Sequence, residues 1–185
     1  YFSECKVVLG VEPTKGPADA AKRGGIKTRI DFFNDDVAKE IIKEEGQFDL
    51  ILSNNMLAHT PDLKSVLSGV RNALKESGKF IVEVQYASDM FIDGKFDTVY
   101  HEHFCYYTIN SALNVFEKNG LYISDVERLS THGGSIRLYA SKQKIVQSDR
   151  LKRLIAKEIE QFSGGNVYGQ FFEKAKKSKN NFLTR

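Results

Sequence analysis

The sequence predicts an α/β protein with a doubly wound, mostly parallel sheet. Strand-like and helix-like segments alternate four times between residues 6 and 85. The strand-like segments are largely apolar, which is typical of parallel strands that are buried on both faces. Right-handed crossover helices are the economical way to connect and cover such strands, so the alternation favours helices on both faces of one sheet.

Four segments have the pattern of strands in this sheet. The first is a short β-branched run that ends at Glu12-Pro13, and the third is apolar almost throughout. We expect the first to be a buried parallel strand. The predicted strands are residues 6–11, 27–33, 48–55 and 79–85.

Three helices are predicted between these strands, at residues 16–25, 34–46 and 62–78. In the second helix Asn34 is a plausible N-cap, acidic residues fill the first turn and a glycine ends it. The third helix has an amphipathic spacing, with apolar residues recurring on one face and Gly78 after its end.

The pattern changes after Gln85. Residues 86–107 are a polar and aromatic connection that is too long for an ordinary loop, and such loops are usually functional. Thr108 is the expected cap of a helix over residues 109–120. Two strands at 121–130 and 134–141 then predict an antiparallel hairpin that closes one edge of the sheet, and trailing charged helices follow.

Composition and charge exclude several classes of function. The net charge is +3 and the basic excess lies in the C-terminal tail, without any nucleic-acid-binding motif. Cys5 and Cys105 have no CxxC spacing, so neither a disulfide framework nor a structural zinc site is predicted. No apolar run is long enough to cross a bilayer and no signal-peptide pattern is present, so a cytoplasmic location is expected.

Polar residues at the strand ends are candidates for ligand binding, because ligands of open α/β sheets bind beyond the carboxyl ends of the strands. Glu12 could accept the hydroxyls of a ribose, or could simply be an acid near a helix N-terminus. Residues 31–34 (DFFN) could surround a nucleobase, or their phenylalanines could fill the core. A histidine such as His59, between a strand and a helix, is more often a satisfied loop residue than a catalyst.

The stretch TVYHEHFCYY at residues 98–107 holds two of the four histidines of the chain. A metal site could use His101 and His103, but ligands beyond Glu102 and Cys105 are lacking. A buried polar network is a second interpretation, although burying several titratable groups is costly. The third is acid–base catalysis, in which a histidine takes a proton, a glutamate orients it and a tyrosine hydroxyl stabilises an oxyanion.

The stretch STHGGSIRLYA is the last motif. Gly133 and Gly134 permit a tight turn, which explains them without any ligand. His132, Ser135 and Arg137 beside the turn would also suit an anionic substrate, because an arginine fork matches the geometry of a phosphate.

Four stretches, in this order, resemble a known family: GVEP, FDLILSNNMLAHTPDL, FDTVYHEHFCYYTINSALNVFEKNGL and THGGSIRLYAS. They are similar to the S-adenosylmethionine-dependent sugar C-methyltransferases, which act on nucleotide-linked keto-deoxysugars. The resemblance covers roughly residues 7–141 and implies a Rossmann-like methyltransferase fold. It implies a small-molecule nucleotide sugar as substrate and no nucleic-acid or membrane partner.

The resemblance also implies roles for individual residues. His103 would remove the proton next to a ketone, His59 and Tyr100 would stabilise the enolate oxygen, and Glu102 would hold a sugar hydroxyl or the base. The residues implied at the S-adenosylmethionine site are Gly10, Glu12, Asp31, Phe32, Phe33, Asn54 and Asn55. The substrate-binding candidates are His101, His132, Ser135 and Arg137, and no metal is expected.

The family has a zinc-binding N-terminal part, a methyltransferase domain and a Rossmann-like C-terminal domain. By the resemblance, residues 1–141 are a partial methyltransferase domain and residues 142–185 a charged helical linker toward a C-terminal domain. The first strand and its glycine loop are expected upstream of Tyr1, so the chain is expected to be an internal piece that is inactive alone. An O- or N-methyltransferase of small molecules and a truncated, non-catalytic binding domain are the alternatives.

Overall fold

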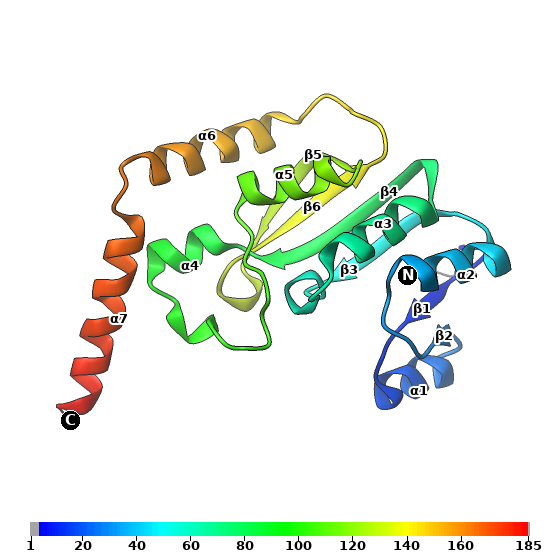
Figure 1. Ribbon diagram of the computed structural model, residues 1–185, viewed down its shortest axis with the longest axis horizontal. Helices are drawn as coiled ribbons and strands as arrows, with labels where there is room; N and C mark the ends of the chain where they lie inside the picture. Colours follow the sequence, from blue (N-terminus) through cyan, green and yellow to red (C-terminus); the bar gives the residue numbers. More distant parts are fainter. Residues whose placement is uncertain (1–3, 185) are drawn as a thin grey trace.

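The computed structural model describes residues 4–184 and contains two separate sheets (Figure 1). The larger sheet consists, in spatial order, of β3 (Phe48–Asn54), β4 (Leu74–Gln85), β6 (Ser135–Ser141) and β5 (Tyr122–Leu129). β3 and β4 are parallel, whereas β6 runs antiparallel to both of its neighbours. The predicted α/β class and the antiparallel hairpin are therefore confirmed.

The smaller sheet pairs β1 (Leu9–Val11) with β2 (Lys27–Arg29) in parallel, and in the described part of the chain neither strand pairs with β3. Both strands are shorter than predicted, since each spans three residues. The predicted burial of the first strand is wrong, because Val7 is 47% exposed and Leu9–Val11 are only partly buried. In the second predicted strand Phe32 is 75% exposed.

The helix predicted at residues 62–78 ends earlier than expected. In the structure α3 spans Leu63–Ala73 and β4 begins at once with Leu74, which pairs with Phe48 of β3. Gly78 lies inside β4, where a Cβ atom would be 2.9 Å from the carbonyl oxygen of Phe48. Pairing with a distant strand therefore draws these residues out of the helix that their own pattern favours.

Helix α2 (Asp35–Glu45) packs on α3 and connects the smaller sheet to the larger one. Asn34 caps α2 as predicted. The carboxylate of Asp35 accepts hydrogen bonds from Ser68 Oγ at 3.0 Å and from Asn72 Nδ2 at 2.8 Å. At Gly69 a Cβ atom would lie 2.8 Å from the carbonyl oxygen of Asn34, so the two helices meet at backbone distance.

The connection at residues 86–107 is partly helical. It contains α4 (Ala87–Asp93), which the sequence pattern did not predict, and the short 3-10 helix η2 (Phe96–Thr98). Gly94 ends α4 in the left-handed conformation, with φ of 74°. A helix of two turns is too short to show an apolar period, which is why sequence reasoning missed it.

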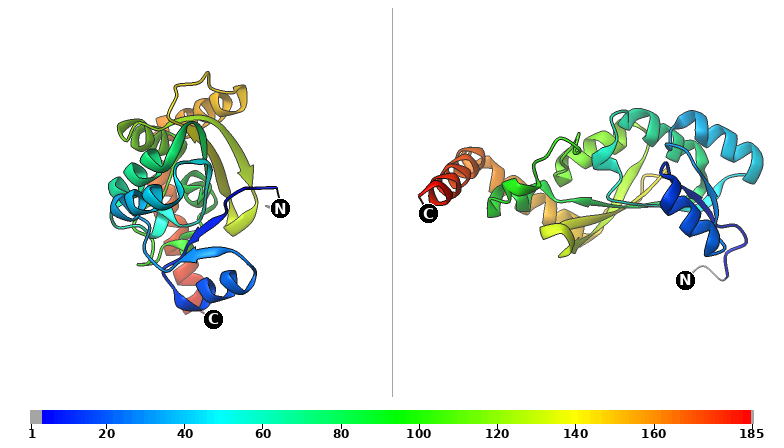
Figure 2. Two further views of the ribbon diagram at one scale, coloured as in Figure 1. Left: turned by 90° about the vertical axis from the view of Figure 1, so that its right-hand side faces the viewer. Right: turned by 90° about the horizontal axis from the view of Figure 1, so that it is seen from below.

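The hydrophobic core lies between the larger sheet and the helices α3 and α5, which cover the same face of it (Figures 1 and 2). α5 spans Ile109–Lys118, and Thr108 caps it as predicted, with a reciprocal capping box to Ser111. Phe80 of β4 stacks on Phe116 of α5 with ring centroids 5.9 Å apart.

Two helices follow the hairpin. Leu151 and Glu158 of α6 (Asp149–Ser163) are buried, so the chain still contributes to the core after residue 141. α7 (Val167–Leu183) has no buried residue and projects from the body of the molecule (Figure 2). The domain boundary at residue 141 stays a prediction. Within residues 4–184 no helix has the length and apolarity needed to cross a membrane.

In the smaller sheet, the helix α1 (Lys15–Arg23) links β1 to β2. It lies in the predicted segment and is shifted by one or two residues at each end. Its first turn follows Glu12 and Thr14 directly, so the polar residues at the carboxyl end of β1 lie beside its N-terminus.

Candidate active site

The predicted site lies where β3 ends and the chain segment of residues 94–107, called the YHEH loop from here on, returns to it. The short 3-10 helix η1 (Leu57–His59) lies in the connection between β3 and α3. The backbone N–H groups of Phe104 and Cys105 both donate to the carbonyl of Ala58, at 2.7 and 3.4 Å. This clamp holds the YHEH loop against η1, so the loop and the strand end share one site.

The clamp brings together three of the four candidate catalytic side chains. The rings of His59 and His103 meet edge to face, with centroids 4.7 Å apart. The Tyr100 hydroxyl is 3.0 Å from His103 Nε2, and the two rings have centroids 4.2 Å apart. Tyr106 also contacts the His103 ring, edge to face, at 5.5 Å between centroids. The roles of these residues stay predictions.

The surroundings of His103 favour the uncharged form of its ring. Partial burial of the ring lowers the pKa of His103 below its ordinary value, and the neighbouring His59 lowers this pKa further. Its Nδ1 atom is buried without a hydrogen-bond partner in the described part of the chain. A neutral imidazole with one nitrogen facing a tyrosine hydroxyl is a group that can accept a proton.

The geometry also defines the tautomer of His59. Its Nδ1 atom lies 3.0 Å from the carbonyl oxygen of Glu102. Because a carbonyl can only accept, Nδ1 must carry the hydrogen, which leaves Nε2 with a lone pair in the neutral ring. Glu102 therefore acts here through its backbone, which sequence reasoning did not anticipate. The side chains of Glu102 and His101 are exposed.

The candidate cofactor residues Glu12 and Asp31 lie at the carboxyl ends of the two small parallel strands. Oε1 of Glu12 accepts hydrogen bonds from the backbone N–H of Thr14 at 2.9 Å and from its hydroxyl. These bonds lower the pKa of Glu12, so the carboxylate stays ionised, and Oε2 accepts no hydrogen bond from residues 4–184. Asp31 accepts from Arg29 at 3.3 Å and from the backbone of Phe32 at 3.0 Å.

The two phenylalanines that follow Asp31 behave differently. Phe33 packs against the core, whereas Phe32 exposes an aromatic face to solvent. The alternative that both fill the core therefore fails for Phe32. Gly10 lies inside β1, where a Cβ atom would be 3.1 Å from Thr28 Oγ1, so its immediate role is close contact between the two strands.

Asn54 and Asn55 lie at the carboxyl end of β3. The side chain of Asn54 is exposed. Asn55 has φ of 53°, a left-handed conformation that is uncommon for residues other than glycine, and its N–H donates to the carbonyl of Glu83 at 2.8 Å. Such conformations cluster at functional sites. An ionised acid, an exposed aromatic ring and two strand-end amides fit a nucleoside with a polar tail.

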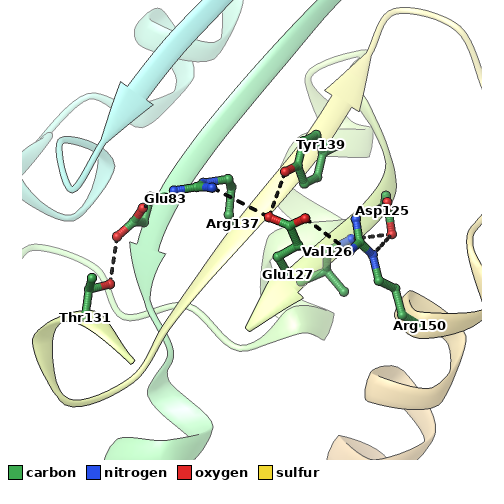
Figure 3. A network of polar contacts seen from close by, with 8 residues as sticks. All are labelled: Glu83, Asp125, Val126, Glu127, Thr131, Arg137, Tyr139 and Arg150. Atoms are coloured by element: carbon green, nitrogen blue, oxygen red, sulfur yellow. Dashed lines mark hydrogen bonds and ion pairs between the residues drawn. The ribbon is translucent and has the colours of Figure 1, made fainter. Parts of the chain in front are cut away.

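Arg137 is part of a polar network across the hairpin (Figure 3). Its guanidinium contacts Glu83 Oε2 at 3.2 Å and Glu127 Oε2 at 3.6 Å, so two carboxylates balance its charge. Glu83 is only 6% exposed and also accepts from Thr131 Oγ1 at 2.8 Å. Sequence reasoning missed Glu83, although a charge inside the apolar strand KFIVEVQ was the available signal.

The turn between β5 and β6 contains the 3-10 helix η3 (Thr131–Gly133). Ser135 is fully buried and donates to the carbonyl of Thr131 at 3.0 Å, so its hydroxyl stabilises the turn. His132 is exposed and has φ of 51°. Lys95 of the YHEH loop bonds to the carbonyl of Gly133, which places the turn beside the loop.

Two other features lie apart from this cluster. An open groove of about 420 Å³ runs between β5 and α6, lined in part by Arg128, Arg150 and Arg153. Across residues 4–184 no group of three His, Cys, Asp or Glu side chains is placed to hold a metal ion.

Comparison with known proteins decides the family. The methyltransferase domain family matches residues 3–126, which is more than half of the chain. The chain belongs to this methyltransferase family. S-Adenosylmethionine is the methyl donor of the family, so the cofactor prediction is confirmed at this level.

The methyltransferase chain is also similar to a curated protein, the C-methyltransferase NovU of Streptomyces niveus. The two are 37% identical over 134 residues, which is 72% of this chain and 32% of the relative. The chain therefore spans about a third of the length of that protein.

Solved structures share the methyltransferase fold. An S-adenosylmethionine-dependent methyltransferase from Thermotoga maritima superposes with a TM-score of 0.55 at 15% identity, covering 76% of this chain and 75% of that one. Magnesium protoporphyrin IX methyltransferase from Synechocystis, with bound S-adenosylhomocysteine, gives 0.55 at 12% identity and covers 74% and 64%. At these identities the likeness concerns the fold alone.

Proposed function

We propose that the protein transfers a methyl group from S-adenosylmethionine to the carbon next to the ketone of a nucleotide-linked deoxysugar. The observation that carries this proposal is the imidazole of His103, held against Tyr100 and His59 beside the carboxyl end of β3, where burial and His59 lower its pKa. Methylation of carbon requires a carbon acid to lose its proton, and a neutral histidine is suited to take it. The similarity to a C-methyltransferase supports the same chemistry.

The residues around β1 and β3 would hold the cofactor. Glu12 would accept the ribose hydroxyls with its free carboxylate oxygen, and Phe32 would lie against the adenine. Asn54 and Asn55 would bind the methionine portion. When bound, S-adenosylmethionine supplies a methyl group on a positively charged sulfur, which reacts with a carbon nucleophile.

His103 acts on the substrate in this proposal. Its Nε2 atom takes the proton from the carbon next to the ketone, and the ring becomes an imidazolium. Tyr100 then donates its hydroxyl hydrogen bond to the enolate oxygen instead of to His103. His59 keeps its Nδ1–H on the Glu102 carbonyl, so it adds a second donor to the enolate only when its Nε2 is also protonated.

Holding the substrate at this site supplies much of the acceleration, on the order of several kcal/mol in well-oriented reactions. His101, His132 and Glu102 are exposed around the cluster and are the candidates for contacts to the sugar. Ser135 and Arg137 would support the turn and the strand behind them through their own hydrogen bonds.

The decisive experiment follows the proton rather than the methyl group. In a protein that contains this chain and has the full length of its relative (the longer protein from here on), incubation with the ketosugar in deuterated water should exchange the hydrogen next to the ketone, and His103→Ala should abolish that exchange. Exchange that persists in a folded His103→Ala variant removes His103 from the role of base. An O- or N-methyltransferase needs no carbon acid, so methyl transfer without any exchange would favour that alternative.

A further inference from the structure

A buried carboxylate of α6 lies at the base of the candidate catalytic loop. Glu158 is only 2% exposed, and a buried carboxylate is costly unless its oxygens are hydrogen-bonded. It meets that condition with four hydrogen bonds, all from uncharged donors. The carboxylate also lies at the N-terminus of α5, where the helix dipole favours negative charge.

The four donors belong to two places in the chain. Oε2 accepts from the Tyr86 hydroxyl at 2.9 Å and from the backbone N–H of Ile109 at 2.7 Å. Oε1 accepts from the backbone N–H and the side-chain amide of Asn110, at 2.9 and 2.7 Å. Burial raises the pKa of Tyr86, so its hydroxyl remains protonated and donates.

These two places are the two ends of the segment that carries Tyr100 and His103. Tyr86 is the N-cap of α4, before the YHEH loop, and Ile109 begins α5 directly after it. The ends also contact each other, because the N–H of Ala87 donates to the carbonyl of Tyr107 at 2.9 Å. One carboxylate therefore fastens both ends of the segment at a single point.

We propose that Glu158 is a positioning residue, which fastens the ends of residues 87–108 so that the YHEH loop presents His103 to Tyr100 and His59. The loop is held at its far side by the Ala58 clamp and at its base by Glu158. Glu158 comes from a helix beyond residue 126, where the match to the family ends. A helix outside the matched region thus completes the arrangement of the candidate site.

This inference rests on the proposed function for its catalytic meaning, but its structural content can be tested without turnover. NMR of this chain should show contacts between the His103 and Tyr100 rings. In Glu158→Gln these contacts should weaken, because an amide NH₂ would face the N–H donors of α5. The pKa of His103 should rise toward its ordinary value as the ring becomes solvated. Neighbouring groups that face the ring are Tyr100, His59, Glu102 and Tyr106.

Two further variants keep the test decisive. Glu160→Gln removes the same charge from an exposed position of the same helix and should leave the His103 signals unchanged. Tyr86→Phe removes a single hydroxyl from the Glu158 cluster. It should weaken the ring contacts of His103 and raise the pKa of His103, as Glu158→Gln does, by a smaller amount. Unchanged His103 signals in a folded Glu158→Gln variant, or in Tyr86→Phe if Glu158→Gln does not fold, overturn the proposal.

Activity of the longer protein provides a separate measurement. Glu158→Gln should lower kcat by about 10- to 100-fold, as small misplacements of reacting groups do, with the KM for the cofactor little changed. If the His103–Tyr100 ring contacts weaken in Glu158→Gln while the wild-type protein methylates no ketosugar, the positioning role stands and the proposed function fails. If methylation occurs and the His103 contacts do not depend on Glu158, only the positioning role fails.

Discussion

At the scale of single residues, the imidazoles of His59 and His103 lie in the candidate site with ring centroids 4.7 Å apart, but their hydrogen-bond partners differ. His59 is oriented by a backbone carbonyl, which fixes its tautomer. His103 faces a tyrosine hydroxyl and has a pKa that burial and the neighbouring imidazole lower. A second imidazole therefore tunes the first by discouraging its positive charge.

This tuning predicts a pH dependence for the longer protein. Because the pKa of His103 is lowered, the neutral base persists below pH 6.5, and kcat/KM should fall only as the pH drops through that lowered value. His59→Ala removes one cause of the lowering and admits water, so the acidic limb should move to higher pH. A pH profile of kcat/KM measures this shift.

His132→Ala is the matched control for that profile. It removes an exposed imidazole that does not contact the His103 ring in the described residues, so the acidic limb should keep its position even if the rate changes. An acidic limb that stays unmoved in His59→Ala, or that moves equally in both variants, would show that another group titrates.

At the scale of elements, the contact between α2 and α3 joins the two sheets through very short distances. Gly69 lies where a Cβ atom would be 2.8 Å from the carbonyl oxygen of Asn34 and 3.1 Å from the Cβ of Ala38. A backbone carbonyl at a helix start cannot move aside as a flexible side chain can. The contact therefore depends on the absence of a side chain at residue 69.

Gly69→Ala should accordingly destabilise the chain by about 1–3 kcal/mol, the usual cost of overpacking a close contact. Gly16→Ala in α1 is the matched control, because no atom lies within 4 Å of its Cβ position. There the same change should stabilise by about 0.4–1 kcal/mol through the unfolded state. Urea unfolding of both variants measures the difference, and equal effects would contradict the packing argument.

The elements also show how far the sequence could predict the structure. The caps at Asn34 and Thr108 were predictable because a cap is a contact within a few residues. The end of α3 was not, since Leu74 leaves the helix to pair with Phe48, a residue distant in the chain. β2 also ends earlier than predicted, at Arg29.

The candidate site also has parts that the sequence could predict and parts that it could not. Chain order and the resemblance placed His59, Tyr100 and His103 together, and the structure brings them into contact. The parts contributed by Glu83 and Glu158 were not predictable, because each depends on donors that lie far away in the sequence. An acid inside an apolar strand, such as Glu83, indicates that a partner is needed but not which residue supplies it. An acid in a charged helix, such as Glu158, does not stand out from its neighbours.

At the scale of the whole molecule, the chain matches about a third of the length of its curated relative. The proposed cofactor residues belong to the smaller sheet and to the end of β3, and no described strand ladder joins these two places. The site that we propose for S-adenosylmethionine is therefore assembled across the contact between α2 and α3, which joins these two parts of the chain.

Calorimetry with S-adenosylhomocysteine tests this assembly. The longer protein should bind S-adenosylhomocysteine tightly, and this chain should bind it weakly. Glu12→Gln in the longer protein should reduce the affinity about 10-fold, or about 1.4 kcal/mol, because it removes the negative carboxylate that would accept hydrogen bonds from the ribose hydroxyls. Asp19→Gln, on the adjoining helix α1, is a control that should bind like the wild type. Absence of binding by the longer protein would leave a non-catalytic role as the better explanation.

The separation of the two sheets has a consequence for amide hydrogen exchange. β1 and β2 hold each other through a ladder of three residues, whereas β4 is bonded on both sides within the larger sheet. The two ladders share no hydrogen bond in the described chain, so opening one does not require opening the other. The backbone amides of β1 and β2 should therefore exchange with solvent independently of the larger sheet, and much faster than the amides at the centre of β4.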